Sequence, residues 1–280
     1  MDSLQNHLHR LQERLKGSSE SYRLDAQVLL SHVLQKPRAW LLAHPEAHLT
    51  PDQRQELEQA VQRLERGEPL PYVLGHWEFY GLDFLVSPAV LIPRPETELL
   101  VEYALRWLQE HPGRRSAADI GTGSGCIAVS LAVNVPDLQV IAGDISPAAL
   151  QVARSNAARH DVTDRVHCIQ TDLLSGVEER FDLICANLPY IPTEILQNLD
   201  VARAEPWLAL DGGPDGLSSV RRLLQDLPAR LAPGGLALLE IEASQGAAAR
   251  QAAGRFFKAD QVSVLPDLAG RDRLLIISNQ

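Results

Sequence analysis

Apolar residues in the first quarter of the chain recur at three- and four-residue steps, the period of a helix. One such face consists of four leucines, Leu4, Leu8, Leu11 and Leu15. A second apolar face spans residues 25–34, and Thr50 followed by Pro51 is typical of a helix start, because the hydroxyl caps the first turn and proline suits the first helical position. The pattern predicts a small all-helical domain over residues 1–75.

A different pattern follows this segment. Aromatic and apolar residues cluster around Gly81, which predicts a β-hairpin; they are Trp77, Phe79, Tyr80, Phe84 and Val86. Pro93 and Pro95 then exclude a regular strand ladder. Residues 76–96 are therefore predicted to form a hairpin and a proline-rich linker, and residues 97–109 an amphipathic helix.

Short apolar runs alternate with helical patterns in the rest of the chain. The predicted strands are residues 117–120, 138–142, 166–169, 181–186, 236–241, 262–265 and 274–278. Helices are predicted after Ser146-Pro147 and over 217–231 and 244–253. Strands that alternate with helices favour parallel crossovers, so we predict an α/β fold with a doubly wound, mostly parallel seven-stranded sheet over residues 97–280. The loop between the last two strands is too short for a crossover helix, so one of them should be antiparallel.

Composition narrows the classes of function. The chain has 280 residues, of which 45% are hydrophobic, and its 26 basic and 36 acidic side chains give a net charge of −10. This excess of acid disfavours binding along nucleic acid. Neither a membrane span nor a signal peptide is visible, which suggests a cytoplasmic protein. Three scattered cysteines, Cys126, Cys168 and Cys185, suit neither a disulfide framework nor a metal site and are expected to be buried.

A glycine-rich loop follows the first strand of this sheet, in the order Asp119-Ile120-Gly121-Thr122-Gly123-Ser124-Gly125. Glycines allow sharp turns and a close approach of ligand to backbone. The G-x-G-x-G spacing differs from that of dinucleotide sites, which disfavours an NAD-dependent oxidoreductase. The absence of a following Walker lysine disfavours ATP. A tight structural turn is the alternative.

Two aspartates complete a predicted crevice. Asp144 ends the next strand, 144 − 125 = 19 residues beyond Gly125, where it could accept hydrogen bonds from both ribose hydroxyls of a nucleoside. Asp172 is expected at the end of the third strand, where it could meet an adenine amino group, with Leu173 against the adenine face. Each aspartate alone could be a helix cap or a solvated loop residue. Together with the glycine loop they predict a site for one adenosine-like ligand.

The segment Asn187-Leu188-Pro189-Tyr190 follows the fourth strand. An Asn carboxamide oxygen and the neighbouring backbone carbonyl can each accept one N–H of a planar amino group, and Tyr190 can stack on that plane. An ordinary turn would use the same residue types. At this place in the sheet, the segment predicts a site for a planar nitrogen.

These motifs together resemble the class I S-adenosylmethionine (SAM) dependent methyltransferases that modify a planar amide or amine nitrogen. Five further segments resemble the peptide chain release factor glutamine methyltransferases over nearly the whole chain: residues 71–75 (PYVLG), 78–81 (EFYG), 92–98 (IPRPETE), 205–216 (which include LALDGGPDG) and 267–273 (DLAGRDR). The resemblance implies transfer of a methyl group from SAM, without a metal, to the glutamine of the Gly-Gly-Gln motif of release factors. It also implies an effect on translation termination, a substrate-docking role for residues 1–75 and a monomer.

The resemblance assigns a role to each motif residue. It implies catalytic roles for Asn187, Pro189 and Tyr190, and substrate binding by Asn187, Leu188, Pro189 and Tyr190. It implies cofactor binding by Gly121, Thr122, Gly123, Ser124, Gly125, Asp144, Asp172, Leu173 and Asn187.

Two positions depart from the family pattern. Leu188 stands where proline is usual, but it keeps the backbone carbonyl, and Pro189 still favours an extended conformation for it. Glu242 stands where glycine is frequent. The alternatives left open are a methyltransferase for a ribosomal-protein glutamine or for adenine N6 of nucleic acid, and a non-catalytic binding module on the same fold.

Overall fold

The computed structural model describes residues 2–17 and 21–279, and its contacts divide the chain into two compact units, Met1–His76 and Trp77–Gln280. No helix in these described stretches is long and apolar enough to cross a membrane. The three predicted segments, 1–75, 76–96 and 97–280, stay predictions.

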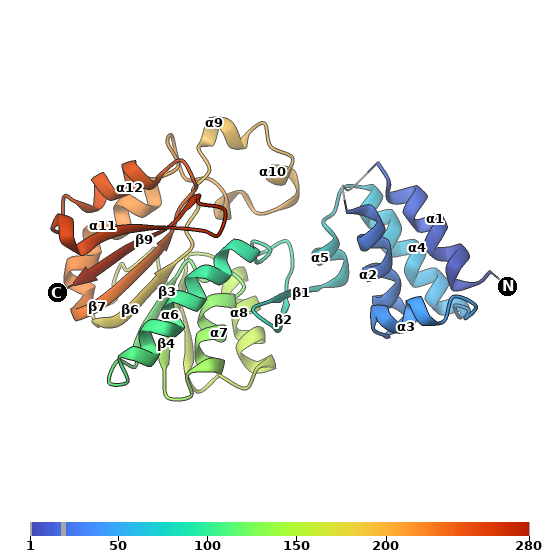
Figure 1. Ribbon diagram of the computed structural model, residues 1–280, viewed down its shortest axis with the longest axis horizontal. Helices are drawn as coiled ribbons and strands as arrows, with labels where there is room; N and C mark the ends of the chain where they lie inside the picture. The colour runs from blue at the N-terminus through green and yellow to red at the C-terminus, as the bar shows by residue number, and fades with distance from the viewer. Residues whose placement is uncertain (1, 18–20, 280) are drawn as a thin grey trace. The chain divides into compact units, whose positions relative to one another are not determined.

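The first unit consists of helices (Figure 1), with the bounds α1 Leu4–Leu15, α2 Tyr22–Leu34, α3 Arg38–Ala43, α4 Pro51–Glu65 and α5 Leu70–Leu74. The predicted helix start at Thr50 is confirmed. The Thr50 hydroxyl accepts a hydrogen bond from the Gln53 N–H at 3.2 Å, and the Gln53 side chain accepts one from the Thr50 N–H at 3.0 Å. Apolar faces of α1, α2 and α4 form the core of this unit, as the leucine spacing predicted.

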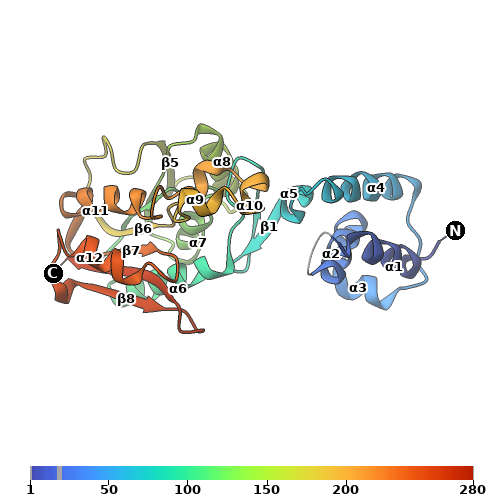
Figure 2. The same cartoon turned by 90° about the horizontal axis from the view of Figure 1, so that it is seen from above.

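The second unit begins with the predicted hairpin and continues as a three-layer α/β structure (Figures 1 and 2). Its strands are β1 His76–Phe79, β2 Leu82–Leu85, β3 Ser116–Ile120, β4 Gln139–Asp144, β5 Val166–Gln170, β6 Phe181–Ala186, β7 Leu231–Glu240, β8 Val262–Pro266 and β9 Asp272–Asn279. Its longer helices are α6 Glu98–Glu110, α7 Cys126–Asn134, α8 Pro147–Arg159, α11 Ser218–Arg230 and α12 Gly246–Ala253. One-turn elements are η1 Pro95–Thr97, α9 Thr193–Leu196, α10 Val201–Ala204, η2 Trp207–Ala209 and η3 Ala259–Gln261.

The large sheet has the predicted doubly wound topology. Its seven strands lie in the order β5-β4-β3-β6-β7-β9-β8, and the first five are parallel. Strand β9 is antiparallel to both of its neighbours, which confirms the expectation from the short β8–β9 loop.

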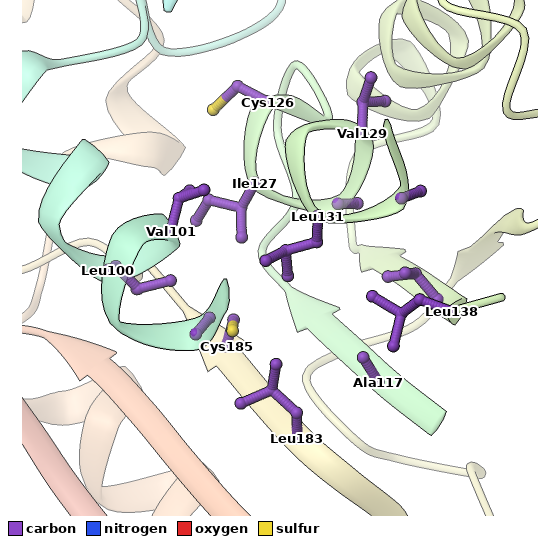
Figure 3. Packing of buried hydrophobic residues seen from close by; sticks show 14 of the residues in the cluster. Leu100, Val101, Ala117, Cys126, Ile127, Val129, Leu131, Leu138, Leu183 and Cys185 are labelled. Carbon is purple, nitrogen blue, oxygen red and sulfur yellow. The ribbon is translucent and has the colours of Figure 1, made fainter. Parts of the chain in front are cut away.

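Successive residues of each strand point to opposite faces of the sheet and belong to two hydrophobic cores, one on each face. On one face, α6 and α7 cover the sheet: Val101 of α6 lies beside Ile127 of α7, and Leu100 belongs to the same cluster as Leu183 and Cys185 of β6 (Figure 3). The opposite face is packed by α11 and α12 against the intervening residues of β3, β6 and β7. Because both faces are covered, the strands are apolar almost throughout.

Three expectations need correction. Cys168 is only partly buried because it lies on the edge strand β5, whereas Cys126 and Cys185 are buried as predicted. Asp172 lies two residues beyond β5, in a turn rather than at the strand end. The helix predicted from residue 97 begins at Glu98, because the prolines before it impose a 3₁₀ turn that includes Thr97.

Candidate active site

The register of the parallel strands brings the three predicted motifs to one edge of the sheet. Ile120, the last residue of β3, pairs with Gly143 on one side and with Ala186 on the other. Gly121, Asp144 and Asn187 each follow one of these paired residues, so they lie side by side at the carboxyl ends of the three strands. The strand order also reverses beside β3, and such a switch point is where open α/β sheets bind ligands.

The glycine loop needs glycine at each of its three positions. Gly121, Gly123 and Gly125 have φ angles of 73°, 54° and 80°, a region that side chains disfavour. A Cβ at Gly125 would also lie 3.2 Å from the Cα of Ala153, so glycine here lets α7 pack closely against α8. These constraints explain the spacing that the sequence showed.

Asp119 supports the loop from beneath. It is fully buried, and one carboxylate oxygen accepts hydrogen bonds from the Thr122 hydroxyl at 2.6 Å and from the Ala128 N–H at 3.2 Å. Burial raises the pKa of Asp119 to about 7. The side chain thus ties the loop to the first turn of α7 and does not line the cavity.

Asp144 holds the loop from the side that faces the ligand. Its Oδ2 accepts a hydrogen bond from the Gly123 N–H at 2.9 Å, and its Oδ1 accepts one from the Ser146 N–H at 2.9 Å. Because a carboxylate oxygen has two lone pairs, each oxygen can accept one hydrogen bond more. Asp144 is therefore fixed in place and still able to accept from a diol.

Asp172 and Leu173 line the cavity from the turn that follows β5. Asp172 forms an exposed ion pair with Arg222 of α11 at 2.6 Å, a contact that the sequence did not suggest. Leu173 has a φ of 55°, and both residues line the cavity. Since one oxygen of Asp172 meets Arg222, the other remains for an amino group.

Asn187 has a partner that fixes its orientation. Its Nδ2 donates a hydrogen bond to the Thr97 hydroxyl oxygen at 3.0 Å. The carboxamide oxygen is then the atom left for a ligand. Leu188 is buried, and a Cβ placed on Gly121 would lie 3.0 Å from its Cδ2, so the leucine packs against the glycine loop.

A cavity of about 220 Å³ joins these residues. Predicted residues in its wall are Gly121, Thr122, Gly123, Ser124, Asp144, Asp172, Leu173, Asn187, Leu188 and Pro189. Gly125 and Tyr190 are outside this lining. Tyr190 lies behind it, where the Gln245 side chain donates to its carbonyl oxygen at 2.9 Å.

One wall of the cavity was not predicted from the sequence. That wall comes from the proline-rich segment and from η2, and it includes Ala89, Val90, Leu91, Pro93, Arg94, Thr97, Pro206, Leu208 and Ala209. Pro93 and Pro95, with the charged residues Arg94 and Glu96, mark this segment as unusual in the sequence. They do not indicate which strand end the segment covers.

A buried ion pair joins the two parts of that wall. Glu205 is 8% exposed, and its carboxylate binds the Arg94 guanidinium and accepts a hydrogen bond from the Ile92 N–H at 3.0 Å. The partners are 111 residues apart in sequence, so the pair fixes the proline-rich segment against the segment before η2.

Replacing Glu205 with alanine should therefore lower the free energy of unfolding by about 2 kcal/mol, because Arg94 and the Ile92 N–H lose a buried partner. Chemical denaturation measures this. Glu194→Ala, a change at an exposed carboxylate on α9, is the control. An equal effect of the two changes would contradict the role of the pair.

Glu242, which departs from the family pattern, stays outside the cavity lining. Its carboxylate accepts hydrogen bonds from the N–H and hydroxyl of Ser244 and so stabilises the turn before α12. Across residues 2–17 and 21–279, no three His, Cys, Asp or Glu side chains gather closely enough to hold a metal ion.

The chain is similar to proteins of one named family along most of its length. Residues 6–75 match the family described as PrmC N-terminal domain, and residues 96–204 match the methyltransferase small domain. A release factor glutamine methyltransferase of Moorella thermoacetica is 46% identical over 262 residues, which cover 93% of this chain and 92% of that protein. The protein of the same name from Escherichia coli is 42% identical over 238 residues, covering 84% of each.

Solved structures support the fold. The N-terminal domain of human METTL16 in complex with SAH matches with a TM-score of 0.53 at 14% identity, covering 90% of this chain and 94% of that one. A ribosomal protein L11 methylase from Lactobacillus delbrueckii matches with a TM-score of 0.50 at 24% identity, covering 70% and 84%. The likeness shows a class I methyltransferase fold. The extent and identity of the sequence matches show more: the chain belongs to the release factor glutamine methyltransferase family.

Proposed function

We propose that this methyltransferase moves a methyl group from SAM to the side-chain amide nitrogen of the glutamine in the Gly-Gly-Gln motif of release factors, and so modulates translation termination in the cytoplasm. The observation that carries the proposal is the orientation of Asn187. Its NH₂ group is engaged by Thr97, so its oxygen faces the cavity as an acceptor for an amide N–H. The names of the relatives support release factors as the substrate.

The cavity has the chemistry that SAM requires. SAM supplies an electrophilic methyl group on a cationic sulfur. Asp144 offers acceptors for a ribose, Asp172 offers one for an adenine amino group, and Ile145 and Leu173 provide apolar walls for the base. The glycine loop, which Asp119 holds in place, brings the backbone close to the part of the cavity proposed for the rest of the SAM molecule.

The substrate amide is a poor nucleophile, because its nitrogen lone pair is delocalised into the carbonyl. The protein's contribution is to align nitrogen, methyl carbon and sulfur in a site that excludes water. The Asn187 oxygen and the Leu188 carbonyl accept the two N–H groups and stabilise the positive charge that develops on nitrogen. As the new N–C bond forms, the S–C bond breaks and its electron pair stays on sulfur. One amide proton then passes to water as the methylated product leaves the site. Pro189, which lines the cavity, is proposed to hold the plane of the amide, and Tyr190 is proposed to support this segment from behind the lining.

A comparison of substrates tests this function. The protein is incubated with SAM labelled in its methyl group and, separately, with a bacterial release factor, a ribosomal protein and an adenine-containing oligonucleotide. The proposal expects label in the release factor only. Label in either of the others would favour that alternative, and SAM binding without any transfer would favour a non-catalytic module.

We also propose that the helical unit binds the release factor outside its Gly-Gly-Gln loop. A chain that begins at His76 keeps every residue that lines the cavity. It should bind SAM with an affinity within about twofold of the full chain and methylate the intact factor at least about tenfold more slowly. Equal rates for the two proteins on the intact factor would show that the helices do not dock the substrate.

A further inference from the structure

One buried carboxylate next to the site takes no part in the chemistry proposed for it. Glu240, the last residue of β7, is 1% exposed and pairs with Leu274 of β9. It does not line the cavity. Neither of its oxygens has a hydrogen-bond partner of normal geometry among residues 2–17 and 21–279. A buried acid without a partner is costly, so its presence calls for a functional reason.

The groups around Glu240 come from η1, β9, α7 and the loop after β6. Burial raises its pKa to about 7, while the nearby Thr97 hydroxyl, the Arg273 guanidinium and the Tyr190 hydroxyl favour the charged form and Glu96 opposes it. Cys126, at the start of α7, also lies within its field. Thr97 is the link to the site, because it is 2% exposed and holds the NH₂ group of Asn187 at 3.0 Å.

The direction of that hydrogen bond restricts where the Thr97 proton can go. A hydroxyl has a single proton to donate, and its oxygen already accepts from Asn187. The proton is therefore free for another acceptor, and the Glu240 carboxylate is the charged acceptor beside it. A hydrogen bond from this hydroxyl to an ionised Glu240 would complete a chain from Asn187 through Thr97 to Glu240 and would keep the Asn187 oxygen toward the cavity.

We propose that Glu240 is a positioning residue, whose carboxylate sets the direction of the Asn187–Thr97–Glu240 hydrogen-bond chain and thereby keeps the Asn187 oxygen toward the substrate amide. The inference rests on the proposed function of Asn187. It adds a third residue to the Asn-x-Pro-Tyr motif, one that is distant in sequence and acts without touching the substrate.

The proposal predicts a dependence on pH with a definite sign. A protonated Glu240 can donate to Thr97, which can then donate to the Asn187 oxygen once the carboxamide turns over. That state presents an NH₂ group to the N–H groups of the substrate and is inactive. Because the pKa of Glu240 is about 7, kcat should rise between about pH 6 and about pH 8 as the acid ionises.

The test compares wild type with Glu240→Gln, which keeps the shape but can place a donor toward Thr97. This variant should lower kcat at about pH 8 by about tenfold or more, keep the KM for SAM within about twofold, and lose the rise with pH. Asp119 also has a pKa of about 7, but it lies beneath the glycine loop and is intact in the variant. The control Glu242→Gln should behave as wild type.

Thr97 provides a second pair of variants. Thr97→Ser keeps the hydroxyl and should retain the pH profile, whereas Thr97→Val keeps the shape without it and should match Glu240→Gln. A Glu240→Gln protein with the kcat and pH profile of wild type would overturn the proposal.

A measurement without substrate separates this inference from the proposed function. The side-chain amide resonance of Asn187, followed by ¹⁵N NMR, should shift with a midpoint near the pKa of Glu240 of about 7 in wild type, and this shift should vanish in Glu240→Gln. A resonance that does not shift with pH in wild type, or that shifts equally in Glu240→Gln, would contradict the hydrogen-bond chain whatever the enzyme methylates.

Discussion

Asn187→Ala is expected to slow methyl transfer in a single turnover by at least about a hundredfold, while SAM affinity changes by no more than about threefold. The alanine removes the acceptor that orients the amide and leaves the Thr97 hydroxyl without its donor. The contacts proposed for the adenosine end of SAM, at Asp144 on β4 and at Asp172 in the turn after β5, come from other segments and should persist. Quenched-flow transfer and calorimetric SAM titration measure the two quantities.

Asn187→Asp sharpens this prediction, because it keeps an acceptor and changes only the NH₂ group. A carboxylate oxygen would face the Thr97 oxygen, and the new charge would lie near Glu240. We expect a loss almost as large as with alanine. A near-normal rate in either variant would mean that the segment from Asn187 to Tyr190 is only a turn.

Asp144→Ala is expected to weaken SAM binding by about 2–3 kcal/mol, which is about 30-fold to about 150-fold in affinity. The change removes the proposed acceptors for the ribose. It also leaves the N–H groups of Gly123 and Ser146 without their acceptor, so part of the loss comes from a looser glycine loop. Isothermal titration calorimetry with SAM is the measurement.

The control for this variant is Asp164→Ala, at an aspartate whose side chain is 78% exposed and makes only a distant ion pair. It should bind SAM as wild type does. Circular dichroism of both variants checks that the fold is retained. Unchanged affinity in Asp144→Ala would exclude the proposed cofactor site.

The sheet and one half of the site could be predicted from sequence because their signals are local. The positive φ angles of Gly121, Gly123 and Gly125 require glycine, so the loop is visible in the residues themselves. Strand alternation with helices then sets the parallel topology. That topology alone places Asp144 and Asn187 at the ends of β4 and β6, the two strands that flank β3.

The other half of the site depends on contacts between distant segments. Thr97 meets Asn187 across 90 residues, and Arg94 meets Glu205 across 111. The periodicity of apolar residues carries no information about such distant pairs. A threonine before a helix is expected to be an ordinary N-cap. Here the Thr97 hydroxyl caps nothing and instead holds the carboxamide of Asn187. Arg222 was missed for the same reason, because it reaches Asp172 from α11.

Methylation of one glutamine nitrogen held by Asn187 is the reaction proposed for the cavity. The most direct test incubates the full chain with methyl-labelled SAM and a bacterial release factor, followed by fragmentation mass spectrometry of the product. The account predicts one methyl group on the amide nitrogen of the glutamine in the Gly-Gly-Gln motif, with none when Asn187→Ala replaces the wild-type enzyme. A methyl group on any other residue, or an equal yield at the glutamine from Asn187→Ala, would contradict it.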